Sequence, residues 1–351
     1  MNSKLAEGEN SSKKMAKISL FLALEKFFSD LPERSAGIIK DRYGIESKEP
    51  KTLEEIGKEY NITRERVRQI IRETFKKLKK KKSENTDAVN NKIKFTIEEK
   101  NDIMKKEVLL SDDLEIKEKG SLKFFLDIFG NFSFKEIQGE LEGSWATESF
   151  DINEWRKIKN SVKEILEKIK NPLTNQELLE KIKESGGIDA EQKKIFDYLE
   201  VSSEIKKGSF EKWGLKIWDE ITPKGTKEKI YLILKETGKP LHFKEIAGLI
   251  DKHKLNKKKK THPQTIHNEL IRDKRFILVG RGIYALSEWG YSQGTVKEVI
   301  EDILKKNAEP MEREEIINRI LNARKVKKST VLINLNNFFE KVGKKRYYIK
   351  K

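Results

Sequence analysis

Apolar residues recur at helical spacing along most of this chain, and short aromatic runs take over at intervals in its C-terminal half. Positions three and four apart share one helix face. On this basis residues 15–30 and 151–170 predict amphipathic helices, and residues 121–129 predict a buried helix. Residues 1–14 are polar and predict a disordered tail, while residues 83–93 predict a linker. The pattern therefore favours a mainly α-helical protein with several separately folded parts.

Residues 52–78 predict two helices joined by a tight turn. Thr52 followed by Glu55 forms a capping box at the start of the first helix. The motif Y-N-I then breaks that helix, and Thr63 is a suitable N-cap for the second one. Gly57 lies where the two helices would approach each other most closely.

The second of these helices has two chemically different faces. At 100° per residue its polar face spans an arc of about 140°, and it carries Arg64, Glu65, Arg68, Gln69 and Arg72. The opposite face and the first helix are expected to pack together through Val67, Ile70, Thr74, Leu53, Ile56 and Ile62. Arginine can pair with guanine, glutamine with adenine, and glutamate can accept from cytosine. The polar face therefore predicts a helix that reads the major groove, although a solvated face on a helical hairpin would carry the same charges.

A weak repeat follows in the C-terminal half. Three prolines, separated by 68 and then 70 residues, each precede a glutamate by five positions: Pro172, Pro240 and Pro310. Each repeat predicts helices followed by an aromatic β-hairpin, and the hairpins are expected at 212–218, 280–286 and 345–349. Helices closed by a two-stranded ribbon follow the winged-helix plan, and a fixed period indicates tandem units, which we predict at 171–222, 226–291 and 295–351. Residues 94–170 predict a helical middle region that we assign to no module.

The composition favours a nucleic-acid partner. The 351 residues include 75 Lys and Arg against 58 Asp and Glu, a formal net charge of +17, and such an excess attracts polyanions. No cysteine is present, which excludes disulfides and thiolate metal sites. The four histidines form no facing pair with a carboxylate, and no apolar run reaches the ~20 residues of a membrane span. Neither a glycine-rich phosphate loop nor a nucleophile system is found, so we predict a non-enzymatic protein with no metal, cofactor or small-molecule substrate.

Four motifs follow one another in the N-terminal part: L-P-E-R at 31–34, R-Y-G-I at 42–45, T-L-E-E-I-G at 52–57 and T-R-E-R-V-R-Q-I at 63–70. In this order and spacing they resemble region 4 of the major bacterial sigma-factor family, over a domain expected at 15–82. The resemblance implies a helix-turn-helix that reads the promoter −35 element in double-stranded DNA and docks on the flap of the RNA polymerase core.

The same resemblance implies roles for individual residues. Four side chains of the second helix would face bases: Arg64, Glu65, Arg68 and Gln69. Three other residues would contact phosphates, the last two of them through a helix N-terminus: Arg42, Thr52 and Leu53. A phosphate contact is also expected from Arg72 on the polar face of the second helix. Ile71 departs from the family pattern, which usually has an acidic residue there, and is expected to add an apolar group beside the reading face.

A second group of motifs lies in the middle repeat: K-P-L-H-F-K-E-I at 239–246, I-R-D-K-R-F-I-L-V-G-R-G-I-Y-A-L at 271–286 and W-G-Y at 289–291. They resemble the HARE helix-turn-helix family, whose winged-helix members include the N-terminal domain of the RNA polymerase delta subunit. The resemblance implies a link to DNA or to the transcription machinery without fixing the binding face. Phosphate contacts are expected from Lys257, Lys258, Lys259, Lys260, His262, Gln264 and Arg281, and in the last unit from Arg324, Lys325, Lys327 and Lys328.

Together these features predict a mainly α fold, with a sigma region 4-like helix-turn-helix followed by tandem winged-helix units with short β-hairpin wings. They favour a sequence-specific DNA-binding transcription factor that works with bacterial RNA polymerase at initiation, in the cytoplasm and on nucleoid DNA. Nothing in the sequence resembles the aromatic cluster of the sigma −10 melting region, so we expect that module to be lacking. Two alternatives stay open: a polymerase-binding interaction factor with little DNA binding, and the DNA-binding subunit of a restriction or defence system.

Overall fold

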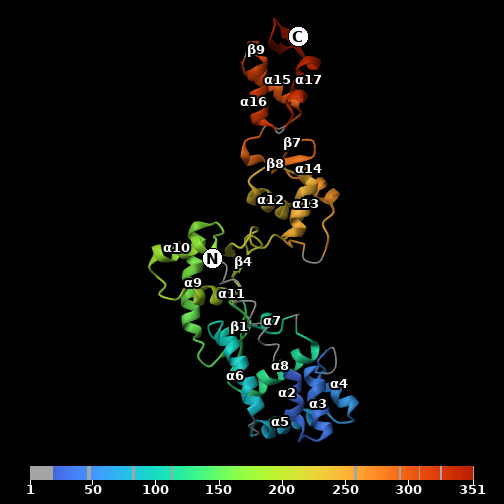
Figure 1. The fold of residues 1–351 in the computed structure, drawn as a ribbon, viewed down its shortest axis with the longest axis vertical. Helices are drawn as coiled ribbons and strands as arrows, with labels where there is room; N and C mark the ends of the chain where they lie inside the picture. The colour runs from blue at the N-terminus through green and yellow to red at the C-terminus, as the bar shows by residue number, and fades with distance from the viewer. Residues whose placement is uncertain are drawn as a thin grey trace. The chain divides into compact units, whose positions relative to one another are not determined.

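The computed structural model describes residues 19–45, 49–80, 84–111, 114–256, 259–291, 294–307, 309–324 and 326–350. The expected tail at 1–14 and the expected contacts of Lys257, Lys258 and Lys325 lie outside these ranges. The chain forms two compact units, one of residues up to 170 with 177–206 and the other of 171–176 with 207–351 (Figure 1). Both units are built mainly of helices, which confirms the predicted mainly α class.

The predicted helix-turn-helix is present near the start of the first unit, with two further helices before it. These helices are α2 (Leu20–Phe28), α3 (Glu33–Tyr43), α4 (Leu53–Glu59) and α5 (Arg64–Lys80). The Ser19 side chain caps α2. Helix α3 ends at Gly44 with a φ of 66°, a left-handed conformation that glycine adopts without strain. Beneath the turn, α3, α4 and α5 share a small core of Ile38, Ile56 and Val67.

The linker predicted at 83–93 is wrong for the described part of that stretch. Helix α6 (Glu84–Glu98) runs through it and places Val89, Ile93 and Ile97 fully inside the core. These three residues are four apart, so they line one helix face. The stretch is polar on average because only this narrow stripe is apolar, and Ile97 lies beyond the segment that we read as a linker.

The middle region holds a small sheet as well as helices, which corrects its description as purely helical. Its elements are β1 (Ile103–Lys105), α7 (Lys106–Leu109), α8 (Ile116–Phe129), β2 (Phe132–Ile137), β3 (Leu141–Thr147) and α9 (Ile152–Ile169). The strands form an antiparallel sheet in the order β1-β3-β2, with Phe134 opposite Trp145. The two helices predicted here, one buried and one amphipathic, are confirmed as α8 and α9.

One large core joins the helix-turn-helix to this middle region. It contains residues of α2, α3, α5, α6 and α8, and it is rich in phenylalanine. Glu118 of α8 accepts hydrogen bonds at the start of α2 from the Ser19 hydroxyl at 2.6 Å and the Leu20 amide at 2.8 Å. A Cβ on Gly120 would lie 2.9 Å from the Ile45 Cα, so α8 crosses the end of α3 at close range. The helix-turn-helix is therefore not a separate domain within the first unit.

The second unit contains two modules with the same order of elements. The first is α12 (Thr226–Thr237), β6 (Leu241–His242), α13 (Phe243–Lys252), α14 (Pro263–Arg272), β7 (Phe276–Gly280) and β8 (Ile283–Leu286), with the short helix η1 (Ser287–Trp289) after it. The other is α15 (Val296–Asn307), β9 (Met311–Glu312), α16 (Arg313–Ala323), α17 (Lys328–Phe338), β10 (Phe339–Val342) and β11 (Arg346–Ile349). In both, the strand before the second helix pairs with the last strand, giving the orders β6-β8-β7 and β10-β11-β9. Each module encloses its own apolar core.

The first repeat has a similar order of elements with a reduced sheet. Along the chain, α9 is followed by α10 (Asn175–Ser185), α11 (Gln192–Glu200), β4 (Ile205–Lys207) and β5 (Trp213–Leu215). A single bridge between Leu173 and Trp213 stands where the other repeats have a paired strand. A unit starting at 171 would therefore omit the helix that corresponds to α12 and α15.

No described helix is long and apolar enough to cross a membrane. Among the described residues, no group of three His, Asp or Glu side chains is arranged to hold a metal ion.

Candidate nucleic-acid interface

The turn before α5 is fixed by side-chain caps and by one glycine. The Thr52 hydroxyl accepts from the Glu55 amide at 3.2 Å, and the Glu55 carboxylate accepts from the Thr52 amide at 2.7 Å, which confirms the predicted capping box. The Thr63 hydroxyl accepts from the Arg66 amide at 3.2 Å at the start of α5. A Cβ on Gly57 would lie 2.7 Å from the Ile62 carbonyl oxygen, so the close approach predicted at this glycine is confirmed.

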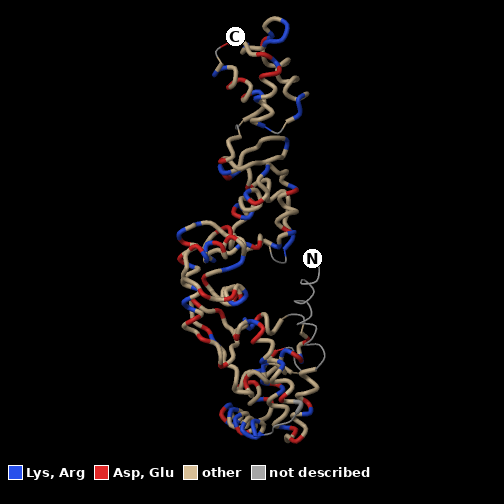
Figure 2. The backbone as a smooth tube through the Cα atoms, turned by 60° about the vertical axis from the view of Figure 1, so that its left-hand side comes forward, with Lys and Arg blue, Asp and Glu red and all other residues tan. Residues whose placement is uncertain are grey.

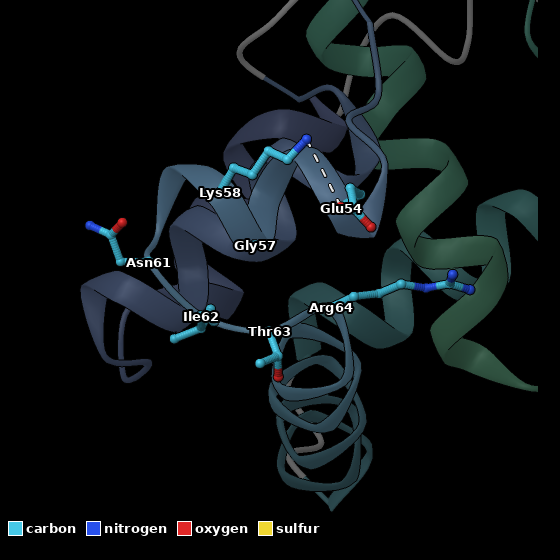
Figure 3. Close-up of a pocket in the computed structure, with 7 residues that line it drawn as sticks. All are labelled: Glu54, Gly57, Lys58, Asn61, Ile62, Thr63 and Arg64. Atoms are coloured by element: carbon cyan, nitrogen blue, oxygen red, sulfur yellow. Dashed lines mark ion pairs between the residues drawn. The ribbon is translucent and has the colours of Figure 1, made fainter.

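A shallow hollow of about 420 Å³ lies on the surface at this turn (Figure 3). It is lined by Glu54, Gly57, Lys58, Asn61, Ile62, Thr63 and Arg64. Among these described residues, the Lys58 ammonium pairs with the Glu54 carboxylate at 3.9 Å, and Arg64 reaches away from the turn. The hollow is open to solvent and lies directly beside the start of α5.

Helix α5 exposes the face predicted to read bases and buries the opposite one. Arg64, Glu65, Arg68 and Gln69 are all exposed, whereas Val67 is fully buried in the core beneath the turn. The structure thus brings the four predicted side chains together on one surface beside the turn. Their contact with bases stays a prediction.

Two of these side chains hold each other in a fork. The Arg68 guanidinium donates to the Glu65 carboxylate through Nε at 2.9 Å and Nη2 at 2.7 Å. Hydrogen bonds from Arg68 lower the pKa of the Glu65 carboxyl, so the pair stays charged at neutral pH. Arg66, which the sequence analysis left out, donates to the Gln69 side chain at 3.2 Å. The reading face is therefore partly ordered before any partner binds.

The expected phosphate contacts around the turn differ in their surroundings. Arg42 and Arg72 are exposed, and Arg42 Nη1 donates to the Lys51 carbonyl at 3.0 Å. At the start of α4, the capping box already uses the amide of Thr52, and two glutamates occupy the first turn. Leu53 is half-buried. The structure thus favours the two arginines over Thr52 and Leu53 as phosphate contacts.

Ile71 lies at the edge of the reading face. It is half-buried and packs against both the small core beneath the turn and the large core shared with α8. At 100° per residue Ile71 lies about 20° from Arg64, at the edge of the polar face, so the expectation that it adds an apolar group beside that face stays a prediction. Beyond it, the last two turns of α5 expose Lys76, Lys77, Lys79 and Lys80, seen as a blue run at the bottom of Figure 2.

The HARE-like module exposes most of its predicted contact residues. Lys259, Lys260, His262 and Gln264 are exposed just before and at the start of α14, and Arg281 is exposed at the tip of the β7–β8 hairpin. The aromatic motif residues lie elsewhere. Phe276 and Tyr284 are buried, while Phe243 and Trp289 pack against the same core. The aromatic motif residues thus form the core of the module, and the polar residues at the start of α14 stay exposed to solvent.

In the last module one expected phosphate contact is buried. Arg324 is only 4% exposed, and its guanidinium donates to the Leu278 carbonyl at 2.9 Å and to the Gly294 carbonyl. Burial lowers the pKa of this guanidinium from its usual value. The Arg324 guanidinium is therefore used in hydrogen bonds to backbone carbonyls inside the unit, and its burial leaves it no access to a phosphate. Lys327 and Lys328 are exposed, and Lys328 also pairs with Glu314 at 2.8 Å.

The sequence analysis missed a second group of cations on the β10–β11 hairpin. Lys341, Lys344, Lys345 and Arg346 are all exposed there. The signal was present as K-V-G-K-K-R. It was overlooked because the hairpin was placed at 345–349, whereas its first strand begins at Phe339.

Helix α11, which has the position of α14 and α17 in the first repeat, has no comparable surface. Ile195, Asp197 and Tyr198 are buried, so the helix is covered on several sides. The Asp197 carboxylate accepts from Lys100 at 3.1 Å and from the Asn101 amide group at 2.6 Å. This helix is therefore part of the scaffold of the first unit.

Comparisons with known proteins match two segments of the chain. Residues 27–80 match the model of sigma-70 region 4. Residues 225–289 match the model of the HARE-HTH family, a helix-turn-helix domain described for ASXL proteins and restriction endonucleases. Both are families of DNA-binding or transcription domains rather than enzyme families.

Similar curated proteins cover the N-terminal part. The chain is 42% identical over 74 residues to RNA polymerase sigma factor SigA1 of Synechococcus elongatus, over 21% of this chain and 18% of that protein. It is 47% identical over 57 residues to RNA polymerase principal sigma factor HrdD of Streptomyces viridifaciens, over 16% of this chain and 17% of that one. The chain therefore spans less than a fifth of the length of these relatives. Within those limits, it carries a sigma-type region 4 at 27–80 and a HARE-type helix-turn-helix at 225–289.

Proposed function

We propose that this chain is a sequence-specific transcription factor that reads a −35-type promoter element with α5. The observation that carries the proposal is the exposed polar face of α5, which lies opposite the buried Val67 within the segment similar to sigma region 4. An exposed helix N-terminus bearing Arg, Glu and Gln is what recognition of base edges in the major groove requires.

The fork between Glu65 and Arg68 supports this role. A guanidinium already held by a carboxylate loses less rotamer freedom when it meets a base edge. Arg68 can then donate to a guanine while Glu65 accepts from a neighbouring cytosine. Because the pair has no net charge, its contribution favours particular bases more than the phosphate backbone. Affinity for phosphates would come from Arg42, Arg72 and the lysines at the end of α5.

We propose the RNA polymerase core as the protein partner, with its flap as the docking point. Support comes from the relatives, which are named as RNA polymerase sigma factors. The similarity covers region 4, so this chain would supply −35 recognition. The HARE-like module would add phosphate contacts through Lys259, Lys260, His262, Gln264 and Arg281.

A selection from random duplex DNA tests the proposal. The full chain is used at near-physiological salt, because lysine-rich surfaces bind any duplex at low ionic strength. We expect a −35-like motif to be enriched, either by the chain alone or only in the presence of core polymerase. Enrichment of no motif under either condition would refute the proposal, and retention of polymerase in that case would favour an interaction factor.

The Arg68→Ala variant makes the test specific to one residue. We expect it to lose about 1–3 kcal/mol of binding at the selected site, with little change on random DNA. The matched control is Arg319→Ala, since Arg319 is an equally exposed arginine paired with a glutamate on its own helix at 2.7 Å. An equal loss of affinity on selected and random DNA would show that Arg68 does not read bases.

A further inference from the structure

The C-terminal module separates its charges along the chain. Residues 296–315, which include α15 and the start of α16, hold four Lys or Arg and seven Asp or Glu. Residues 324–350, which include α17 and the β10–β11 hairpin, hold nine Lys or Arg and a single glutamate. A random scatter of surface charge would give no such division. The two stretches also meet in the fold, where Lys328 pairs with Glu314 at 2.8 Å and Arg346 lies 3.9 Å from Glu312. The excess of cations on the basic stretch still makes it a candidate surface for a polyanion.

The cations of this basic half lie before α17 and on the hairpin that follows it. Lys327 and Lys328 are exposed at the start of α17. At the other end, β10 follows α17 directly and leads to Lys344 and Lys345 in the hairpin turn. The Tyr347 hydroxyl donates to the Asn336 side chain at 2.7 Å, which holds the hairpin against the helix. Figure 2 shows Lys and Arg in blue at the tip of this module.

Between the two groups of cations, α17 exposes an uncharged face. Thr330, Ile333 and Asn337 are exposed and fall within about 60° of each other at 100° per residue. Val331 and Leu335 lie on the other side and are fully buried. Ile333 is 58% exposed, so an apolar side chain is available on this face. This face could meet the edges of bases, because asparagine can pair with adenine and apolar groups can contact the thymine methyl.

We infer that the C-terminal module is a second duplex-DNA-binding site, with α17 in the major groove and the β10–β11 hairpin on the adjacent backbone. Eleven helical residues span about 16 Å, against a major groove about 12 Å wide. The cations at the start of α17 would therefore meet a phosphate at one wall of the groove, and those on the hairpin beyond β10 would meet the adjacent backbone. The inference goes beyond the proposed function, because this module lies outside both matched segments and does not require base reading by α5.

Because the chain contains no cysteine, a single introduced cysteine gives a unique attachment point. We would couple an iron chelate that generates hydroxyl radicals to the full chain carrying Lys344→Cys and bind it to a duplex. The matched control is Lys306→Cys, at an exposed lysine on α15 in the acidic half of the same module. Strand cleavage is expected with Lys344→Cys and not with Lys306→Cys. No cleavage, or equal cleavage by both variants, would overturn the inference.

Charge reversal gives an independent readout. Each phosphate contact contributes about 0.9 to the slope of log affinity against log salt concentration. The double variant Lys344→Glu with Lys345→Glu should therefore lower that slope by about 2, whereas Lys305→Glu with Lys306→Glu should leave it within about 0.5. An unchanged slope in the hairpin variant would overturn the inference. If that variant also lost polymerase retention, the hairpin would be assigned to a protein partner.

The same experiments distinguish this inference from the proposed function of α5. Cleavage from the Lys344 position is measured on a random duplex, in both the unaltered chain and an Arg68→Ala background. Cleavage that persists in both backgrounds supports the second site even if no −35-like motif is selected. A selected motif without any cleavage would support α5 alone.

Discussion

The shared core predicts that the stability of α5 depends on a residue of α8, far along the chain from the turn before α5. Phe124 of α8 is fully buried, and the ring centroids of Phe28, Tyr43 and Phe75 lie 5.1, 5.5 and 5.6 Å from its own. Replacing a buried phenylalanine with alanine typically costs about 3–5 kcal/mol. Since Phe75 belongs to α5, we expect Phe124→Ala to destabilise α5 together with α2, α3 and α8.

Hydrogen exchange followed by mass spectrometry measures this effect segment by segment. At about 1.4 kcal/mol per tenfold change, a loss of that size speeds exchange in α5 and α8 on the order of 10²- to 10⁴-fold. Peptides from α12 to α17 belong to the other unit and serve as an internal reference that should not change. The control is Phe134→Ala, which removes a ring that is 43% exposed and should have a much smaller effect. Unchanged protection of α5 in Phe124→Ala would refute the idea that α5 and α8 form one cooperative unit.

Three further substitutions test separate parts of the description. Gly57→Ala places a Cβ against the turn backbone and should lower the free energy of unfolding by about 1–3 kcal/mol, as measured by thermal unfolding. It should also weaken site-specific DNA binding, as measured by titration with DNA. Glu204→Gln removes the partner of the buried Lys159 and should destabilise the first unit at pH 7 by about 3 kcal/mol. Arg324→Ala should destabilise the second unit by about 1.5–3 kcal/mol and leave the salt dependence of DNA binding unchanged.

The sign of the pH effect at Glu204 follows from its surroundings. Burial works to raise the pKa of this carboxyl, but hydrogen bonds from Lys159 and Lys163 outweigh burial and lower the pKa. The resulting stability is present above the unfolded pKa of about 4.3 and is lost as the pH falls through the folded pKa. In Glu204→Gln the free energy of unfolding should therefore fall less as the pH drops below about 4.3. Glu200→Gln, at a half-exposed carboxylate, should not change this pH dependence.

The glycine and arginine variants also have controls. Gly248→Ala adds a Cβ where no atom lies within 4 Å in a helix, so it should be neutral or slightly stabilising. If it destabilised the chain as much as Gly57→Ala, the close contact at the turn would not be the cause. A lower salt slope in Arg324→Ala would contradict the buried position of that guanidinium.

The correct predictions came from sequence patterns that involve residues close together in the chain. The capping box at Thr52, the glycine at position 57 and the two faces of α5 depend on residues within a few positions of each other, so the sequence is enough to recognise them. The same holds for α8 and α9, whose apolar spacing is regular. The polar faces of the helices were therefore placed correctly, although which of their side chains touch DNA stays a prediction.

The errors came from contacts between distant residues. The strands β1, β2 and β3 are short, and their pairing depends on register across the sheet, which the local pattern does not contain. Arg324 was expected at the surface because arginine is almost never fully buried without a partner. Its partners are backbone carbonyls at Leu278 and Gly294, which only the fold brings close.

The two proposed DNA-reading helices would divide affinity and specificity differently. Helix α5 places a charge-neutral fork of Glu65 and Arg68 on its reading face, so that face adds base selection with little net attraction to phosphate. Helix α17 has an uncharged face with cations before it and on the hairpin after it, so it would draw much of its affinity from counterion release. Substituting Arg68 should consequently change the selected sequence more than the salt slope, and substituting Lys344 and Lys345 should do the reverse. If both variants shifted both quantities equally, the two helices would have to bind as a single surface.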